Sequence, residues 1–314
     1  MPRTAPVYQP RGARLDTGAG RPMTPPMLLR PTPELAALRQ DWTFAPNKPP
    51  WRVQVRRLGQ RVLRRVPAPA RRVLRSPAGV GAWTIYFVFT PDGLLQAPHR
   101  FALDRLRALG RPLLVVCAAP SPADIPADLA AAADALVWKD LPGFDFSAYT
   151  AGLATLAEHC PGSDALVLND STFGPLVDLA PWLALARWDL TGFTATANVE
   201  NHIQSYAFHL KGVTPARMRA LGPVLMPAHA YDRFWGVVLN QETRFARVAS
   251  RSMSVGSLLF SDMLEAEDPT LQLALPLVRA GFPFLKRSLL GGKLAHLHPE
   301  HEVRDALRAA GYPA

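Results

Sequence analysis

Cysteine is scarce in this 314-residue chain. The two cysteines, Cys117 and Cys160, form neither a spaced pair nor a metal-ligand pattern. This scarcity argues against a disulfide-stapled secreted scaffold and against a structural zinc site. Cys117 lies inside the apolar run 113–119, which predicts a small, buried side chain. We therefore expect a reduced, cytoplasmic protein.

Long apolar runs are also lacking. None approaches the roughly 18–20 residues that a membrane-spanning helix requires. The N-terminus carries arginines but lacks the apolar core of a signal peptide. With 48% hydrophobic residues, the chain can bury one substantial core or two modest ones. The sequence predicts a soluble protein, or at most one attached to a membrane surface.

Acidic residues are fewer than basic ones. The chain has 25 Asp and Glu against 35 Lys and Arg, a formal net charge of +10. This balance favours anionic partners such as nucleic acid, anionic lipid headgroups or phosphorylated substrates. Nine arginines and no acid occur between Trp51 and Arg75. Aromatic residues are not interleaved with these arginines as a base-stacking platform requires, so we expect no nucleic-acid partner.

The basic segment 51–75 also carries a helical pattern. It predicts an amphipathic basic helix that is broken at Pro67. One interpretation is a solvated basic linker. The other is attachment to anionic lipid, which would place the protein peripherally on the inner face of the plasma membrane. The apolar residues at helical spacing are Val55, Leu58, Val62 and Val66.

Composition divides the chain into three parts. Residues 1–50 are rich in Pro, Arg, Thr and Gly, and each X-Pro bond favours extended backbone, so we predict a poorly ordered Pro/Arg-rich arm. Residues 51–75 form the basic helix or linker. Residues 83–314 form the globular domain that would carry the function.

Short apolar runs alternate with helical stretches in the globular part. Because these runs lack polar alternation and are separated by helices, they predict an α/β fold with a mostly parallel central sheet flanked by helices. Ligands of such sheets bind beyond the carboxyl ends of the strands. This rule directs attention to residues 90–92, 139–145 and 169–171. The predicted strands are 84–89, 113–117, 135–138 and 165–168.

The tripeptide Asn169-Asp170-Ser171 follows one of these strands directly. There, the Asp170 carboxylate could hold Mg²⁺ or Mn²⁺ against a diphosphate, with phosphate and water oxygens completing the shell. The same residue types also suit an Asx turn or a helix N-cap. The local pattern leaves both interpretations open.

The loop 139–147 follows another strand and contains Gly143 and Asp145. Its glycine, two carboxylates and lysine could contact a ribose, a base or a phosphate. The alternative is structural, with Asp145 capping a helix that begins near Phe146.

Several segments, taken in order, resemble one family. Gly-Phe-Asp-Phe at 143–146 is similar to its Gly-Tyr-Asp-Phe loop, and Asn-Asp-Ser-Thr-Phe-Gly-Pro at 169–175 to its Asn-Asp-Ser-aromatic-Gly-Pro signature. His-Ile-Gln-Ser-Tyr at 202–206 is similar to its His-Leu-Gln-Ser-Tyr segment. The family is the rhamnan synthesis protein F group of bacterial polysaccharide glycosyltransferases, and the resemblance covers about residues 83–290. The other similar segments are 89–93, 188–192 and 282–286.

The resemblance implies a GT-A-like glycosyltransferase that uses a nucleotide-activated sugar, often dTDP-rhamnose, with a divalent cation (Mg²⁺ or Mn²⁺) as cofactor. The acceptor would be a surface polysaccharide or a lipid-linked glycan. Asp170 would bind the metal and the diphosphate, and Lys286 would contact the diphosphate. Either Asp189 or His202 would deprotonate the acceptor hydroxyl. The residues expected around the nucleotide are Asp92, Gly143, Asp145, Asn169 and Ser171.

Two other function classes stay open beside the active transferase. Asp170 supplies a single carboxylate, which would suit a catalytically weak homologue that binds carbohydrate or serves as a scaffolding subunit of polysaccharide assembly. A nucleic-acid-binding protein ranks third, because only the charge suggests it and the arginines concentrate near the N-terminus.

Overall fold

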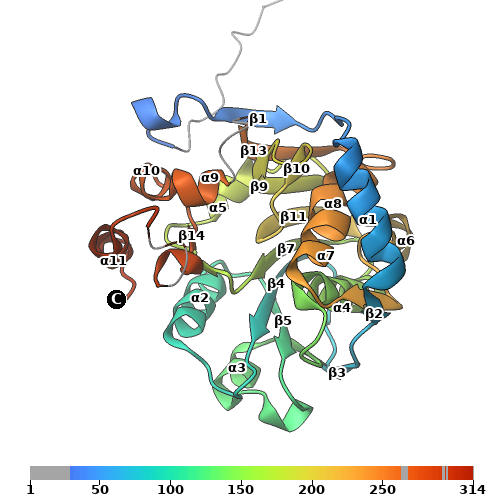
Figure 1. The fold of residues 1–314 in the computed structure, drawn as a ribbon. Coiled ribbons are helices and arrows are strands. Elements are labelled where there is room, and N and C mark those ends of the chain that lie inside the picture. The colour runs from blue at the N-terminus through green and yellow to red at the C-terminus, as the bar shows by residue number, and fades with distance from the viewer. Residues whose placement is uncertain (1–28, 263–267, 292–293, 295, 314) are drawn as a thin grey trace, which may run out of the picture.

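The computed structural model describes residues 29–262, 268–291, 294 and 296–313. Within this part of the chain, ten strands form one large sheet in the order β1-β13-β9-β11-β7-β4-β5-β6-β3, with β10 paired to β9 (Figure 1). The strands are β1 (Arg39–Thr43), β3 (Arg71–Arg75), β4 (Ala82–Phe89), β5 (Leu113–Ala118), β6 (Ala135–Lys139), β7 (Ser163–Asn169), β9 (Leu190–Thr196), β10 (His202–Ile203), β11 (Ala207–Val213) and β13 (Val255–Ser261).

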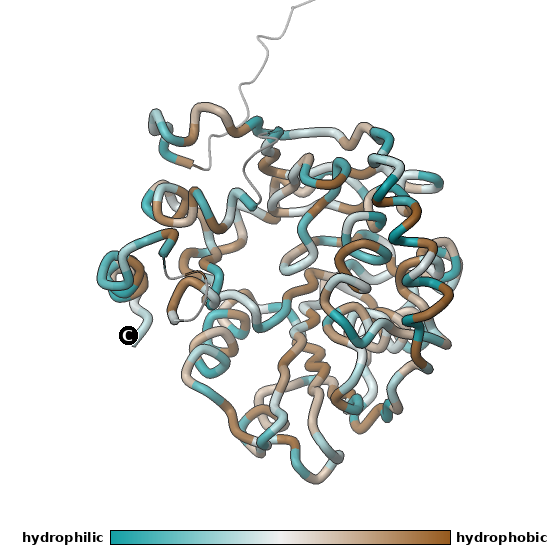
Figure 2. Tube along the Cα trace, in the orientation of Figure 1, coloured by the Kyte–Doolittle hydropathy of each residue, from teal (hydrophilic) through white to brown (hydrophobic). Residues whose placement is uncertain are grey.

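The four apolar runs seen in the sequence form the centre of this sheet. β7, β4, β5 and β6 lie side by side and run parallel, as predicted. Their side chains are almost all buried, because helices cover both faces of the sheet. In Figure 2 these central strands are the most continuously hydrophobic part of the trace.

Helices form the two outer layers. One face packs against α4 (Phe144–His159), α6 (Pro215–Leu221) and α8 (Thr243–Ala249). The other face packs against α2 (Ala97–Arg107), α3 (Ala127–Ala132), α5 (Ala180–Ala184) and α10 (Ala274–Arg279), and buries Cys117 as predicted. The remaining α-helices in the described residues are α1 (Trp51–Leu63), α7 (Phe234–Val237), α9 (Pro269–Gln272) and α11 (Glu300–Ala309).

The second half of the sheet is mixed. β11 lies antiparallel between β7 and β9, and β13 runs parallel to β9, so most strands still share one direction. The predicted α/β class with a mostly parallel sheet flanked by helices is therefore confirmed. β9 was not predicted as a strand because its sequence, Leu-Thr-Gly-Phe-Thr-Ala-Thr, contains a glycine and no continuous apolar run, although all of it is buried.

The N-terminal segments join the sheet more closely than predicted. Residues 1–28 lie outside the described residues, but β1 pairs with β13 and brings Trp42 onto Phe260, with ring centroids 4.2 Å apart. The basic helix is present as α1 and ends at Leu63, before Pro67. After it, β2 (Arg65–Pro67) pairs with β12 (His229–Tyr231), and β3 pairs with β6. The domain boundaries stay predictions.

None of the helices in the described part of the chain combines the length and apolar character needed to cross a membrane.

Candidate functional site

Two cavities adjoin the carboxyl ends of the central strands, where the sheet rule placed the site. They share Phe89, Asp170 and Ser171. The first has a volume of about 500 Å³ and is lined by Phe87, Phe89, Leu141, Phe144, Asp145, Asn169, Asp170, Ser171 and Asp232. The second, of about 560 Å³, is lined by Phe89, Pro91, Gln96, Asp170, Ser171, Lys286, Arg287 and Ser288.

Asn169 ends β7 and organises the turn that follows. Its Oδ1 accepts hydrogen bonds from the Ser171 backbone N–H (3.1 Å) and Oγ (2.6 Å), which is an Asx turn. Its Nδ2 donates to Tyr149 Oη (2.8 Å) and to Asp145 Oδ2 (3.2 Å). The local interpretation as a turn is therefore correct for Asn169, and the turn presents Asp170 to both cavities.

One oxygen of Asp170 is held by the protein. Oδ2 accepts from the Phe89 backbone N–H (2.9 Å) and lies 3.2 Å from His99 Nε2. His99 Nδ1 accepts from the Gln96 backbone N–H (3.2 Å), and His99 Nε2 also lies 3.1 Å from Arg287 Nη1. Oδ1 accepts no hydrogen bond from the described residues. Asp170 thus has one fixed oxygen and one available to a ligand.

Asp145 lies in the first turn of α4 and lines the first cavity. Its Oδ1 accepts from the Phe146 backbone N–H at 2.9 Å. Burial, and next the charge of Glu242, raise the pKa of Asp145 to about 6. Glu242 Oε1 is fixed by the backbone N–H and Oγ of Ser205, both at 2.9 Å. The site therefore holds a carboxyl group that titrates just below neutral pH.

Gly143 shapes the loop that carries Asp145. Its φ is +93°, and a Cβ there would lie 2.8 Å from Ser147 Oγ, so glycine is required. Its N–H donates to Asp232 Oδ1 at 3.1 Å, which places a second carboxylate of the cavity. The conformation of the loop thus requires Gly143, and a hydrogen bond to Asp232, the residue that follows β12, holds the loop in place.

Lys139 is a buried structural support of the same loop. Its Nζ donates to the carbonyl oxygens of Asp140 (2.8 Å) and Pro142 (2.9 Å). Burial lowers its pKa to about 8, against the opposing charges of Asp140, Asp145 and Asp232. Its ammonium group therefore fixes the backbone after β6, because it donates its hydrogen bonds to main-chain carbonyl oxygens.

The second cavity is basic. β14 (Leu285–Lys286) pairs with β8 (Thr172–Phe173), and this pairing brings the late segment back beside Ser171. Lys286 Nζ lies 4.4 Å from the ring centroid of Tyr206. Arg287 donates through Nη1 to the Asp170 carbonyl (3.0 Å) and through Nη2 to Gln96 Oε1 (2.6 Å). Two cations thus line the same cavity as Asp170.

Four predicted residues lie outside the cavity linings: Asp92, Gly143, Asp189 and His202. Asp92 is exposed, and its Oδ1 accepts from the Leu94 backbone N–H (3.0 Å) in a turn after β4. His202 is buried on β10, with Nδ1 2.7 Å from the Glu200 carbonyl oxygen. His202 pairs with Thr196 at the end of β9, which is the same sheet edge as the cavities. Its role stays a prediction.

Asp189 lies at the opposite edge of the sheet. It precedes β9, which runs in the same direction as β7, so it lies where β7 begins and Asn169 lies where β7 ends. Burial raises its pKa, but hydrogen bonds from Ser254 and Arg217 outweigh this and lower the pKa to about 2. The expectation that Asp189 deprotonates the acceptor is therefore wrong on geometry: this carboxylate ties two loops together.

We expect Asp189→Asn to lower stability by about 1 kcal/mol, because the partly exposed ion pair with Arg217 is lost. The lowered pKa means that this contribution is present above pH 3.8 and lost as the pH falls through about 2. Ligand binding at Asp170 should not change. Urea denaturation gives the stability, and nucleotide titration gives the affinity; reduced affinity with unchanged stability would contradict this assignment.

A divalent cation fits this site only with help from a ligand. No group of three His, Cys, Asp or Glu side chains that could hold a metal occurs among the described residues. Asp170 can offer Oδ1, and hard cations such as Mg²⁺ accept few protein ligands when phosphate oxygens and water supply the rest. The donor set therefore suits a cation that arrives with a diphosphate.

Several residues of the site were not predicted. Tyr149 could have been found, because it lies one helical turn after Asp145 and shares its face. Arg287 adjoins the predicted Lys286. His99, Asp232 and Glu242 carry no local signal, since each is brought to the site by long-range packing alone.

Comparisons with known proteins give only distant structural similarity. No protein-family model matches the sequence, and no curated protein matches it significantly. A candidate nucleotide-diphospho-sugar transferase from Desulfovibrio desulfuricans is similar at 12% identity over 72% of this chain and 97% of its own, with a TM-score of 0.36. A mannosyltransferase from Pyrobaculum calidifontis, in complex with GDP-mannose and Mn²⁺, is similar at 15% identity over 84% and 82%, with a TM-score of 0.29. Similarities of this size assign neither a family nor an activity.

Proposed function

We propose that the chain is a GT-A-like glycosyltransferase that uses a nucleoside-diphosphate sugar. The observation that carries the proposal is the meeting of two cavities of different chemistry at Asp170. One cavity combines aromatic side chains with carboxylates, and the other presents two cations. A nucleoside joined to a diphosphate has matching halves: an aromatic base with hydroxyl-bearing ribose, and a dianionic leaving group.

The roles of the residues follow from this match. Phe89 and Phe144 offer ring faces to the base, and Asp145 accepts hydrogen bonds from the ribose hydroxyls. Asp170, through Oδ1, would hold a divalent cation, which would neutralise charge on the leaving diphosphate. Lys286 and Arg287 stabilise the same charge from the other side.

The finer statements rest on the sequence resemblance. The transferred sugar would be rhamnose, and the acceptor a surface polysaccharide or a lipid-linked glycan, within the rhamnan synthesis protein F family. His202, at the same sheet edge, is the proposed acceptor base in place of Asp189. The alternative, a catalytically weak carbohydrate-binding subunit, is favoured by the single carboxylate available to a metal.

Nucleotide binding is the test of this function. A panel of nucleoside diphosphates, each with Mg²⁺ or Mn²⁺, is added to the protein and the melting temperature is recorded. At least one should stabilise the fold, by about 2.7 kcal/mol at a concentration 100 times its Kd. Stabilisation by none of them would contradict the proposal, whereas binding without turnover of the sugar donor would favour the weak homologue.

A further inference from the structure

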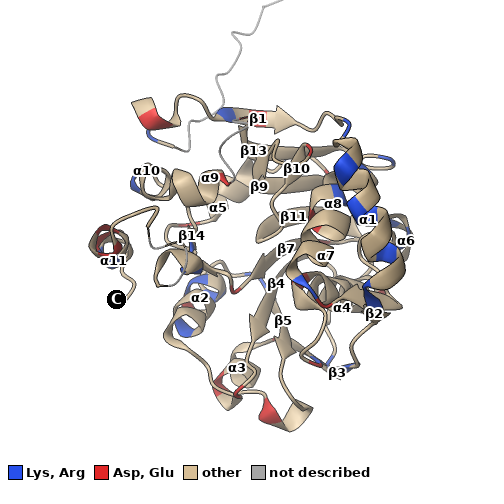
Figure 3. Ribbon diagram, in the orientation of Figure 1, with Lys and Arg blue, Asp and Glu red and all other residues tan. Residues whose placement is uncertain are grey.

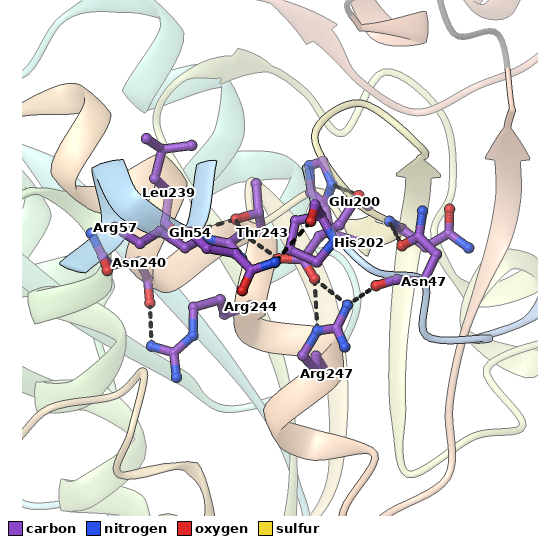
Figure 4. A network of polar contacts seen from close by, with 12 residues as sticks. Asn47, Gln54, Arg57, Glu200, His202, Leu239, Asn240, Thr243, Arg244 and Arg247 are labelled. Carbon is purple, nitrogen blue, oxygen red and sulfur yellow. Dashed lines mark hydrogen bonds and ion pairs between the residues drawn. The ribbon is translucent and has the colours of Figure 1, made fainter. Parts of the chain in front are cut away.

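A second strongly charged region lies between α1 and α8 and shares no lining residue with the two cavities of the site. At its centre is Glu200, a fully buried carboxylate (Figure 4). Arg57 from α1 pairs with Glu200 and also donates to Thr243 Oγ1 at 2.7 Å. Arg247 from α8 donates to Glu200 Oε2 at 2.6 Å. Glu200 thus joins two helices that are far apart in sequence.

The cations in this region outnumber the carboxylate. Burial lowers the pKa of Arg57. Burial, and next the charges of Arg61 and Arg57, lower the pKa of Arg244 to about 10. Uncompensated positive charge in a partly buried cluster is unfavourable, and an anionic ligand would relieve it. Among the described residues, the cations facing Glu200 or the adjoining cavity are Lys48, Arg57, Arg61, Arg244 and Arg247.

A cavity of about 550 Å³ opens beside these cations. Arg57 is 6% exposed, and its Nη1 makes no hydrogen bond within the described residues. Within the described part of the chain, Arg61 uses only Nε, which donates to Asn240 Oδ1 at 3.1 Å, so that its two Nη atoms make no hydrogen bond there. Guanidinium groups of this kind bind phosphate oxygens through paired N–H bonds. The residues that line the cavity are Lys48, Pro49, Gln54, Arg57, Leu58, Arg61 and Arg247.

An exposed apolar surface adjoins the same cavity. Leu58, which lines the cavity, is 63% exposed, and Val62, on the next turn of α1, is 73% exposed. α7 lies against α1 (Figure 1) and adds exposed Phe234 and Trp235; the Arg56 guanidinium lies 5.0 Å from the centroid of Trp235. Basic residues run along the length of α1 (Figure 3). Apolar and cationic side chains on one helix surface are typical of helices that lie in a membrane interface.

We propose that this cavity binds the phosphate headgroup of an anionic lipid, while the exposed apolar side chains of α1 and α7 enter the bilayer surface. The charge excess selects an anion, and Leu58 makes the headgroup cavity continuous with the apolar surface. The cations alone would be enough to bind a soluble anion, and the exposed apolar side chains would then have no role. This proposal concerns a binding event and rests on none of the residues that line the two cavities at Asp170.

Vesicle sedimentation of the full chain tests the proposal. Wild type should bind vesicles of phosphatidylcholine with phosphatidylglycerol and bind much more weakly to phosphatidylcholine alone. Lys48→Gln with Arg61→Gln should weaken binding by about fivefold for each cation removed. Leu58→Ser with Val62→Ser should weaken it with the charge intact. Both pairs leave the ion pairs of Glu200 in place, so the fold should persist.

Two controls distinguish specific lipid binding from unspecific attraction and from binding of a soluble anion. Arg107→Gln with Arg219→Gln removes the same charge from exposed positions on other helices and should leave binding almost unchanged. An equal loss in that control would mean unspecific attraction and would overturn the proposal. A second result would also overturn the proposal. If inorganic phosphate stabilised the wild type but not the Lys48 and Arg61 variant, and the wild type did not bind anionic vesicles, the cavity would serve a soluble anion.

Discussion

Asp170→Asn is expected to fold like the wild type and to lose donor turnover by about 10²- to 10³-fold. The amide can keep the hydrogen bond from the Phe89 backbone N–H, because one of its two atoms is still a carbonyl oxygen. It cannot supply the negative charge that holds a cation beside the diphosphate. Nucleoside diphosphate release from the sugar donor, followed with increasing Mg²⁺ or Mn²⁺, measures the loss and its dependence on the metal.

Asp178→Asn is the matched control for this variant. Asp178 is exposed, lies eight residues later in the chain and caps the turn before α5 through the Ala180 backbone N–H (2.9 Å). It lines neither cavity of the site, so turnover should be unchanged. Full activity and unaltered metal dependence in Asp170→Asn would contradict the role given to this carboxylate.

Asp145→Asn should remove a loss of stability that the wild type shows as the pH rises through about 6, and should weaken nucleotide binding by about 10- to 100-fold. In the folded state the pKa of Asp145 is raised from 3.8 to about 6, so its contribution to stability is fully present below pH 3.8 and lost as the pH rises through about 6. The neutral amide avoids this loss, which we place at about 1–2 kcal/mol because solvent reaches the carboxyl through the cavity.

The pH dependence separates this effect from a packing change. The unfolding free energy of Asp145→Asn relative to wild type should rise by this amount between pH 4 and pH 7, on top of a constant cost, because the amide turns a donor toward either the Phe146 N–H or Asn169 Nδ2 at every pH. Nucleotide affinity of the wild type should rise over the same interval, since the ionised carboxylate is the form that accepts hydrogen bonds from ribose. Glu158→Gln, on the exposed side of α4, should show neither trend; a pH-independent difference for Asp145→Asn would contradict the raised pKa.

Four of the ten strands of the sheet, and the sheet edge at which Asp170 lies, could be predicted from the sequence. β4, β5, β6 and β7 are continuous apolar runs, and the rule for parallel sheets places Asn169, Asp170 and Asp145 at one edge. These inferences need only local pattern and strand direction. Lys286 was predicted to contact the diphosphate, and the pairing of β14 with β8 brings it into the lining of the second cavity.

The rest depends on contacts between distant segments. Asp189 precedes β9, and β9 runs in the same direction as β7 because β11 lies antiparallel between these two strands. The sequence does not show this placement of β11. Residues 39–43 carry no strand pattern of their own, because they form a strand through pairing with β13, more than 200 positions away, and only Trp42 among them is buried. His99 and Glu242 reach the site only through tertiary packing, so no local pattern marks them.

A crystal structure with a nucleoside diphosphate and Mn²⁺ tests the central claim most directly, since the anomalous signal of manganese locates the cation. We predict the base in the cavity beside Phe89 and Phe144, the diphosphate between Asp170 and the Lys286–Arg287 pair, and the manganese peak next to Asp170 Oδ1. A nucleotide bound elsewhere, such as in the cavity beside Arg57 and Arg61, with no manganese at Asp170, would contradict the account.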